Sequence, residues 1–302
     1  MIEVNGLTKR YGDTTAVDDL TFTVRPGEVT GFLGPNGAGK TTTLRMLLGL
    51  VEPTAGTATV GGSRFRDHPR GLRHAGALLD AGDVHGGRTA RAHLAVQARA
   101  NGIPRARVDA VLDEVGLTSA ARRRVAGFSL GMRQRLGIAM ALLGDPPVLI
   151  FDEPLNGLDP EGVLWVRGLF RRLAAEGRTV FVSSHLMTEM EHTADRLVVI
   201  GRGSLIAAET LSAFAARSTR TSVTVRTPDT AALAPLLTAE GAAVTGEGDL
   251  LTVTGLPAER IGELALRHRV LLHGLTPHGA SLEEAFMELT SDSVQYTAGA
   301  PR

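Results

Sequence analysis

Hydrophobic and polar positions alternate in short stretches along the first part of the chain. Residues 2–4 and 20–24 follow a period of two, which predicts strands, and a Pro-Gly turn follows the second stretch. The apolar run at residues 29–33 predicts a buried strand that ends in glycines. A helix is expected to follow over residues 40–48.

Apolar spacing of three and four takes over between residues 86 and 144. It predicts three helices, at residues 90–100, 105–115 and 132–143. Strand patterns return at residues 148–151 and 179–182, on either side of a helix expected at residues 162–175. This alternation predicts an α/β fold with a largely parallel sheet and an inserted helical region.

Composition changes after about residue 215, so we expect two domains, residues 1–215 and 216–302. Residues 218–221 have the composition of a linker. The second domain is predicted to be a small α+β unit, in which no residue pattern indicates catalysis. Its expected strands are at 222–226, 250–253 and 270–275, and its expected helices are at 230–240, 258–267 and 281–289. The tail at residues 297–302 is small, polar and unpatterned, so we expect it to be disordered.

The balance of charge limits the classes of partner. The 302-residue chain carries 32 Lys and Arg against 32 Asp and Glu. This balance argues against a broad nucleic-acid-binding surface, because neutralising phosphates needs an excess of basic residues. The absence of Cys excludes disulfides and thiolate metal sites. No apolar run approaches the roughly 20 residues that span a bilayer, and no signal-peptide pattern follows Met1. We therefore expect a soluble protein that reaches a membrane only through a partner.

A glycine-rich loop after the third predicted strand carries the first chemical signal. It fits the P-loop spacing of Gly, four residues, Gly-Lys-Thr, and a helix is expected directly after it. Backbone N–H groups of such a loop wrap phosphates, and the helix N-terminus adds positive potential. We expect Lys40 to reach the β- and γ-phosphates of ATP, and the Thr41 hydroxyl to bind Mg²⁺. The predicted ATP-binding residues here are Gly34, Pro35, Asn36, Gly37, Ala38, Gly39, Lys40, Thr41 and Thr42.

Two carboxylates follow the apolar strand predicted at residues 148–151. Asp152 and Glu153 would lie at the carboxyl edge of the sheet, where open α/β sheets bind their ligands. Asp152 is suited to the Mg²⁺ shell, and Glu153 to polarising the water that attacks the γ-phosphate. Together with the P-loop, this pair predicts nucleotide hydrolysis.

Over roughly residues 1–211 the chain resembles the ATP-binding-cassette (ABC) ATPase family. Residues 128–135 resemble the family's signature sequence, usually Leu-Ser-Gly-Gly-Gln, with Leu130 and Met132 in place of the usual first Gly and the Gln. The resemblance implies that Ser129, Leu130, Gly131 and Met132 act on ATP bound to a second subunit, from the N-terminus of a helix that begins near Met132. If position 130 required a positive φ, Leu130 would be strained there.

Other positions follow in the order that the family shows. Asp159 resembles the D-loop residue that communicates across a dimer, and His185 the switch histidine that contacts the γ-phosphate. Tyr11 occupies the aromatic position that stacks on adenine. Asp80 stands where the family has its Q-loop glutamine, and its carboxylate could hold magnesium or water.

The resemblance implies an Mg²⁺-dependent ATPase that powers a separately encoded integral-membrane permease. The sequences of residues 157–162 and 281–286 are similar to those of the ATPases of drug, antibiotic and bacteriocin exporters. It implies two subunits, as a homodimer or heterodimer, with ATP sandwiched between them. It also implies a cytoplasmic protein held at the inner face of the membrane by its permease, with no nucleic-acid partner.

Three other hypotheses stay open. One is an importer ATPase with a regulatory C-terminal domain. Another is a non-transport ABC ATPase acting on ribosomes or DNA, which the single cassette, the lack of sustained heptads and the lack of Cys disfavour. The third is a regulatory cassette that binds ATP without turnover; Asp80 and Leu130 keep it open, whereas Lys40 and Glu153 argue against it.

Overall fold

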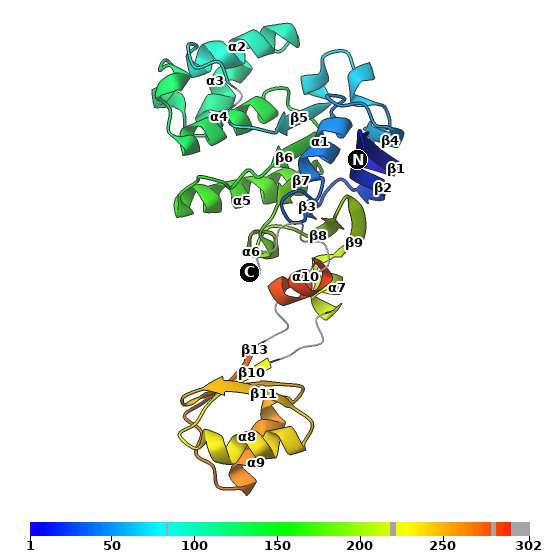
Figure 1. The fold of residues 1–302 in the computed structure, drawn as a ribbon. Helices are drawn as coiled ribbons and strands as arrows, with labels where there is room; N and C mark the ends of the chain where they lie inside the picture. Colours follow the sequence, from blue (N-terminus) through cyan, green and yellow to red (C-terminus); the bar gives the residue numbers. More distant parts are fainter. Residues whose placement is uncertain (83, 218–221, 279–281, 291–302) are drawn as a thin grey trace, which may run out of the picture. The chain divides into compact units, whose positions relative to one another are not determined.

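A computed structural model describes residues 1–82, 84–217, 222–278 and 282–290 (Figure 1). The linker expected at residues 218–221 and the tail expected at 297–302 lie outside these residues. The chain divides into two compact units, one built on Met1–Leu211 and the other on Ser212–Leu289. We propose that the boundary between the two domains follows residue 215. Among the described residues, no helix is both long enough and apolar enough to cross a membrane.

A six-stranded sheet forms the centre of the first unit, in the order β5-β6-β7-β3-β8-β9. All neighbouring pairs are parallel except β8 with β9. The residues of β3, β6 and β7 are buried along their whole length, as strands covered on both faces must be. The strands are β3 (Val29–Leu33), β5 (Ala75–Leu78), β6 (Val148–Asp152), β7 (Thr179–Ser184), β8 (Arg196–Gly201) and β9 (Ser204–Thr210). The predicted α/β fold with a largely parallel sheet is confirmed.

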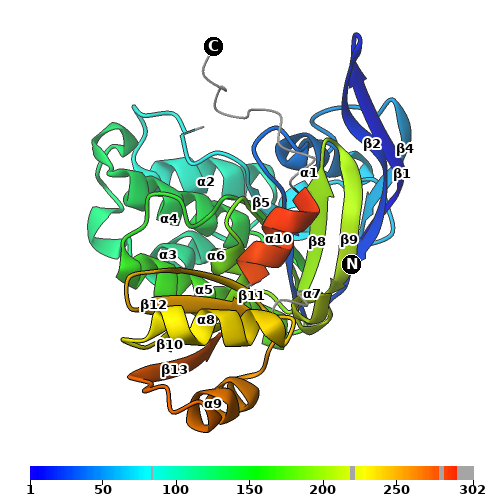
Figure 2. The ribbon, with the colours of Figure 1, turned by 60° about the horizontal axis from the view of Figure 1, so that its bottom comes forward.

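Three antiparallel strands, in the order β2-β1-β4, make a second layer. They are β1 (Ile2–Tyr11), β2 (Thr14–Val24) and β4 (Ala55–Val60). Figure 2 shows them on the side of this unit away from helices α2 to α4. Phe22 on β2 lies with its ring centroid 5.7 Å from that of Phe32 and 5.9 Å from that of Phe181. These rings join the two sheets in one apolar core.

The helices of the first unit confirm most of the predicted pattern. They are α1 (Lys40–Leu47), α2 (Ala90–Ala100), α3 (Arg105–Glu114), α4 (Leu130–Leu142), α5 (Pro160–Ala175) and α6 (Met187–Glu191). The expected start of α4 near Met132 was wrong: the helix begins at Leu130, because the Ser129 side chain accepts a hydrogen bond from the Met132 N–H and caps it. The described part of this unit also has short 3₁₀ turns at Phe65–Asp67, Gly71–Arg73, Thr118–Ala120 and Val125–Gly127.

The second unit contains a β-α-β-β-α-β arrangement of the ferredoxin-like type. Its sheet is antiparallel, in the order β11-β12-β10-β13. Helices α8 and α9 lie together on one face of this sheet (Figure 1), with Leu233 and Ile261 fully buried. Its elements are α7 (Leu211–Arg217), β10 (Ser222–Arg226), α8 (Thr230–Ala239), β11 (Ala243–Glu247), β12 (Leu250–Thr254), α9 (Ala258–Arg267), β13 (Gly274–His278) and α10 (Leu282–Thr290). The strand expected at residues 270–275 begins only at Gly274, and β11 was not predicted.

We predict that Gly76→Ala destabilises the first unit. A Cβ at Gly76, in β5, would overlap the backbone carbonyl of Ala141 in α4, and two packed backbones cannot separate cheaply. The expected loss is at least about 1–3 kcal/mol, measured by chemical denaturation. Gly168→Ala is the matched control, because a Cβ there meets nothing within 4 Å. It should stabilise α5 by roughly 0.5–1 kcal/mol. Equal effects of the two substitutions would contradict this packing.

Candidate functional site

The carboxyl ends of three adjacent parallel strands assemble the site. Strands β6, β7 and β3 are neighbours, with Asp152 opposite Ser183 and Leu33 opposite Ser184. The loop after β3, the carboxylates after β6 and His185 after β7 therefore leave the sheet at one edge. This edge is where open α/β sheets bind their ligands.

The loop at residues 34–39 has three positions at which its backbone favours glycine. Gly37 and Gly39 have φ angles of 82° and 100°. A Cβ at Gly34 would lie 2.5 Å from the carbonyl oxygen of Ile200, and one at Gly39 equally close to that of Ala16. No side chain caps α1, which begins at Lys40. Its first N–H groups are therefore available to an anion, which the helix dipole favours at this end.

Lys40 is buried within this loop, with 7% of its surface exposed. Its Nζ donates to the carbonyl oxygen of Gly34 at 2.6 Å and lies 3.8 Å from Oε1 of Glu153. Burial lowers the pKa of Lys40, and the nearby charges of Glu153 and Asp152 oppose this effect. The ammonium is thus shielded from water and donates to backbone carbonyl oxygens of the loop. A phosphate oxygen could replace these carbonyls as the acceptor.

Thr41 and Asp152 offer hard oxygen atoms that fit a magnesium ion. The Thr41 hydroxyl donates to Oδ2 of Asp152 at 2.8 Å, and the Ser183 hydroxyl donates to Oδ1 of the same carboxylate. Mg²⁺ in nucleotide sites takes one or two carboxylates and completes its shell with phosphates and water. The described residues contain no cluster of three or more His, Cys, Asp or Glu that could hold a metal ion without such phosphates.

Glu153 lies between Lys40 and His185. Its Oε2 is 2.9 Å from Nδ1 of His185. Burial raises the pKa of Glu153, although the hydrogen bond and charge of His185, and then the charge of Lys40, act in the opposite direction. A carboxylate that is partly desolvated in this way accepts a proton more readily than one in water.

The backbone of Glu153 is unusual. Its φ angle is 48°, in the left-handed region that side chains rarely adopt. Its N–H donates to the hydroxyl of Ser183 at 3.0 Å, and its carbonyl accepts from Nε2 of Gln134 at 3.2 Å. Sequence reasoning missed both partners. Ser183 precedes His185 by two positions at the end of a strand, and Gln134 lies within the signature-like segment, so each had a positional signal.

The signature-like residues form the N-terminal end of α4. Ser129 caps it, and Leu130 is 57% exposed. Leu130 is not among the described non-glycine residues with a positive φ, so the strain considered for it does not arise. The Leu130 side chain instead occupies the space beside Gly157, whose φ is 75°.

Three other predicted residues lie at the ends of their elements. Asp159 caps α5 by accepting from the Gly162 N–H at 2.9 Å. Tyr11 ends β1 with half of its surface exposed. Asp80 follows β5 and accepts from the Gly82 N–H at 2.6 Å, so its carboxylate closes a local turn. Their roles toward a nucleotide stay predictions.

Comparisons with known proteins agree with this geometry. Residues 17–156 match the family model described as "ABC transporter", and residues 221–283 match a domain of unknown function, DUF8746. The bacitracin transport ATP-binding protein BcrA of Bacillus licheniformis is 44% identical over 209 residues, 68% of each chain. The Nod factor export ATP-binding protein I of Paraburkholderia xenovorans (strain LB400) is 39% identical over 306 residues, covering 97% of this chain and 98% of the relative. A solved ATP-binding subunit of an ABC transporter superposes with a TM-score of 0.66 at 30% identity, over 72% of this chain and 92% of the other.

We predict that Glu153→Gln is more stable than the wild type at neutral pH. The raised pKa means that the folded protein holds this proton more tightly than the unfolded chain. The contribution of Glu153 to the free energy of unfolding is therefore largest at low pH, and it is lost as the pH rises through the raised pKa. The Gln side chain does not ionise, so the variant does not lose this contribution as the pH rises. The melting temperatures, measured by circular dichroism from roughly pH 4 to 8, should separate as the pH rises.

The matched control is Glu247→Gln, which replaces an exposed carboxylate in β11. It should not reproduce the pH-dependent difference. A Glu153→Gln variant whose melting temperature stays parallel to that of the wild type, or falls below it as the pH rises, would contradict the assignment of a destabilising buried charge.

Proposed function

Because this chain belongs to the ABC transporter family and is an ATP-hydrolysing subunit of it, we propose that it powers export through a separate integral-membrane permease. The observation that carries the proposal is the convergence of five side chains at one sheet edge. They are Lys40, Thr41, Asp152, Glu153 and His185. Bacitracin transport and Nod factor export proteins among its relatives support an exporter, and the latter relative matches both units of the chain.

The P-loop is proposed to bind the phosphates of ATP. The uncapped N–H groups of α1 and the buried Lys40 ammonium supply positive potential where the β- and γ-phosphates would lie. Thr41 and Asp152 would hold Mg²⁺, whose chemistry is to neutralise charge on those phosphates. Tyr11, exposed at the end of β1, is proposed to stack on the adenine.

Glu153 and His185 are proposed to act on the attacking water. Glu153 accepts its proton, for which the raised pKa suits it. His185 holds the Glu153 carboxylate through its Nδ1 atom, which leaves its other ring nitrogen directed to a different group. We propose that this group is the γ-phosphate.

Two subunits are proposed to enclose two ATP molecules, as a homodimer or with a related ATPase. The N-terminal end of α4, with Ser129, Leu130, Gly131 and Met132, would face the nucleotide of the second subunit, where the helix dipole favours negative charge. Asp159 would lie at the same interface. Such an assembly would be peripheral on the cytoplasmic face of the membrane, held by its permease.

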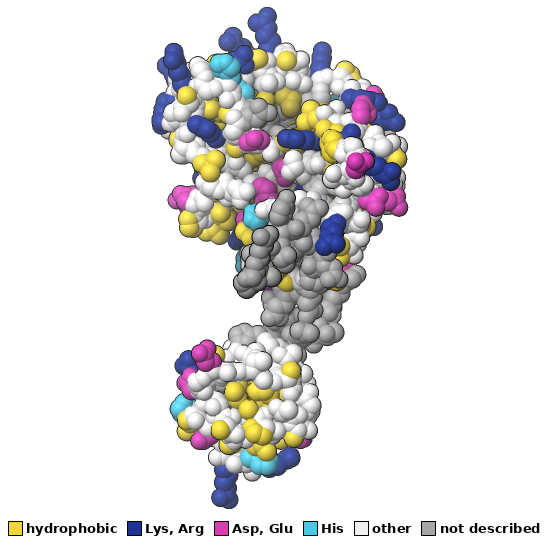
Figure 3. Space-filling view, viewed as in Figure 1, with side chains coloured by type: hydrophobic (Ala, Val, Ile, Leu, Met, Phe, Trp, Pro, Cys, Tyr) yellow, Lys and Arg dark blue, Asp and Glu magenta, His cyan; other side chains and the backbone are white. Residues whose placement is uncertain are grey.

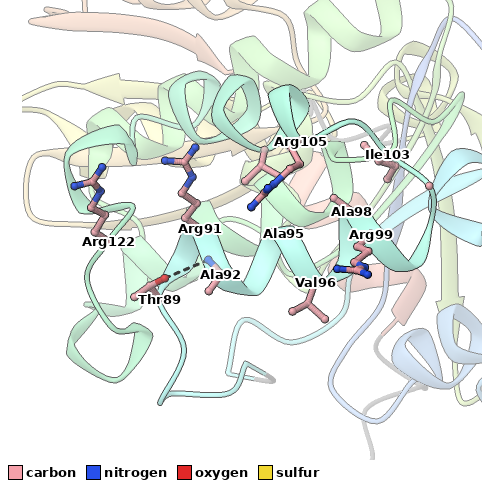
Figure 4. Close-up of a pocket in the computed structure, with 12 residues that line it drawn as sticks. Thr89, Arg91, Ala92, Ala95, Val96, Ala98, Arg99, Ile103, Arg105 and Arg122 are labelled. Atoms are coloured by element: carbon pink, nitrogen blue, oxygen red, sulfur yellow. Dashed lines mark hydrogen bonds between the residues drawn. The ribbon is translucent and has the colours of Figure 1, made fainter.

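A groove on α2 and α3 is proposed to bind the permease. It encloses about 840 Å³, and its floor contains apolar side chains such as Val96, Ile103 and Val108. Figure 4 shows arginines from both helices and the following loop around this floor, and Figure 3 shows basic side chains projecting at the margin of the first unit. Arg91 is paired with Asp109, and the lining includes no acidic residue. This chemistry fits a short amphipathic helix of the permease with acidic flanks.

We predict that Glu153→Gln abolishes hydrolysis but keeps ATP binding. Removing a general base lowers turnover by about 10²–10⁴-fold, while the P-loop contacts remain. Lys40→Ala should instead weaken ATP binding itself, because the loop loses its buried cation. Phosphate release and binding of a fluorescent ATP analogue separate the two effects. Wild-type turnover by Glu153→Gln would contradict the proposed role.

We also predict that reversing groove charges weakens attachment to the permease. Arg99→Glu with Arg105→Glu should lower, about tenfold or more, the fraction that sediments with host membranes stripped of peripheral proteins. Arg267→Glu on α9 is the control for a charge reversal outside the groove and should sediment like the wild type. Equal sedimentation of all three proteins, or equal binding to vesicles made of host lipids alone, would contradict docking on a permease.

A further inference from the structure

Gln134 makes a buried contact with the backbone of Glu153. Gln134 lies on α4 with only 4% of its surface exposed. Its side-chain amide donates from Nε2 to the carbonyl oxygen of Glu153 at 3.2 Å. One hydrogen bond thus joins helix α4 to the residue that follows the central strand β6.

This contact acts on a backbone that needs support. Glu153 has a φ of 48°, a conformation that is unfavourable for a residue with a Cβ. Ser183 holds the N–H side of Glu153, and Gln134 holds the carbonyl side. Since Gln134 is buried, water cannot readily replace its amide. Loss of the amide would therefore free the carbonyl and allow the backbone of Glu153 to relax.

A second contact ties the same helix to the same segment. A Cβ at Gly157 would overlap the Leu130 side chain, so the start of α4 packs directly on the chain four residues beyond Glu153. Leu130 and Gln134 are four residues apart and lie on one face of the helix. Helix α4 therefore contacts the segment from Glu153 to Gly157 at two points.

We infer that Gln134 is a positioning residue that holds the Glu153 carboxylate in place for hydrolysis, through the Glu153 backbone. The inference rests on the proposed role of Glu153 as proton acceptor. Helix α4, which Ser129 caps, thereby also orients the carboxylate that accepts the proton of the attacking water in its own subunit.

The test uses the full chain and the substitution Gln134→Met, which keeps the length of the side chain but removes the donor. It should lower kcat for Mg²⁺-ATP about tenfold or more, with KM changed by no more than about twofold. Gln134→His restores a ring N–H donor at similar reach and should recover most of the activity. Gln97→Met on α2 is the matched control and should leave kcat unchanged. Thermal unfolding checks that each variant is folded.

Nuclear magnetic resonance adds a readout that does not depend on turnover. In protein with ¹⁵N-labelled histidine, the ring nitrogen signals of His185 report its hydrogen bond to Glu153. Gln134→Met should shift them toward their position in Glu153→Ala, and Gln97→Met should not. Unchanged kcat and unchanged His185 signals in folded Gln134→Met would overturn this inference but leave the proposed function intact. A wild-type protein as inactive as Glu153→Gln, even with its permease, would instead contradict the proposed function.

Discussion

The parallel register of β6, β7 and β3 is the constraint on which the site depends. Asp152 lies opposite Ser183, and Leu33 opposite Ser184, so three segments distant in sequence end at one level. A shift of one residue in either pair would place the P-loop and the carboxylates at different levels along the sheet edge. The residues of these strands pack on both faces of the sheet, and the aromatic contact of Phe32 with Phe181 helps to hold the register.

The electrostatics of the site follow from this arrangement. Lys40, Asp152 and Glu153 are brought into a region with little water, where each interaction is stronger than at the surface. Burial lowers the pKa of Lys40 and raises that of Glu153, so the charged form of each group is less favourable here than in water. A bound polyphosphate would bring further negative charge to the Lys40 ammonium, beside that of Glu153 and Asp152. The P-loop side of the proposed nucleotide site is therefore preformed in the folded chain, and Leu130 at the start of α4 is 57% exposed.

The sequence predicted the parallel core and most of the residues at its edge, because both depend on local patterns. An apolar run followed by glycines or by two carboxylates is readable without any knowledge of tertiary contacts. The strands β4, β5, β8, β9 and β11 were not predicted, since their patterns are short or are interrupted by turns. The start of α4 was predicted near Met132 although the helix begins at Leu130, because apolar spacing locates a helix but not its first residue. The left-handed backbone of Glu153 could not be predicted, because it arises only when α4, β6 and β7 pack together. Ser183 and Gln134 had a positional signal, but their contacts with Glu153 depend on the same packing.

The most direct test of the composite site mixes two inactive chains. Lys40→Ala removes the P-loop cation, and Ser129→Arg blocks the N-terminal end of α4; each variant alone should fail to hydrolyse ATP. If a site combines Lys40 of one subunit with Ser129 of another, a mixed dimer contains one intact site, and an equal mixture should recover roughly a quarter of the wild-type rate. A mixture that stays as inactive as its components, although the chains are shown to dimerise, would contradict a site shared between two subunits.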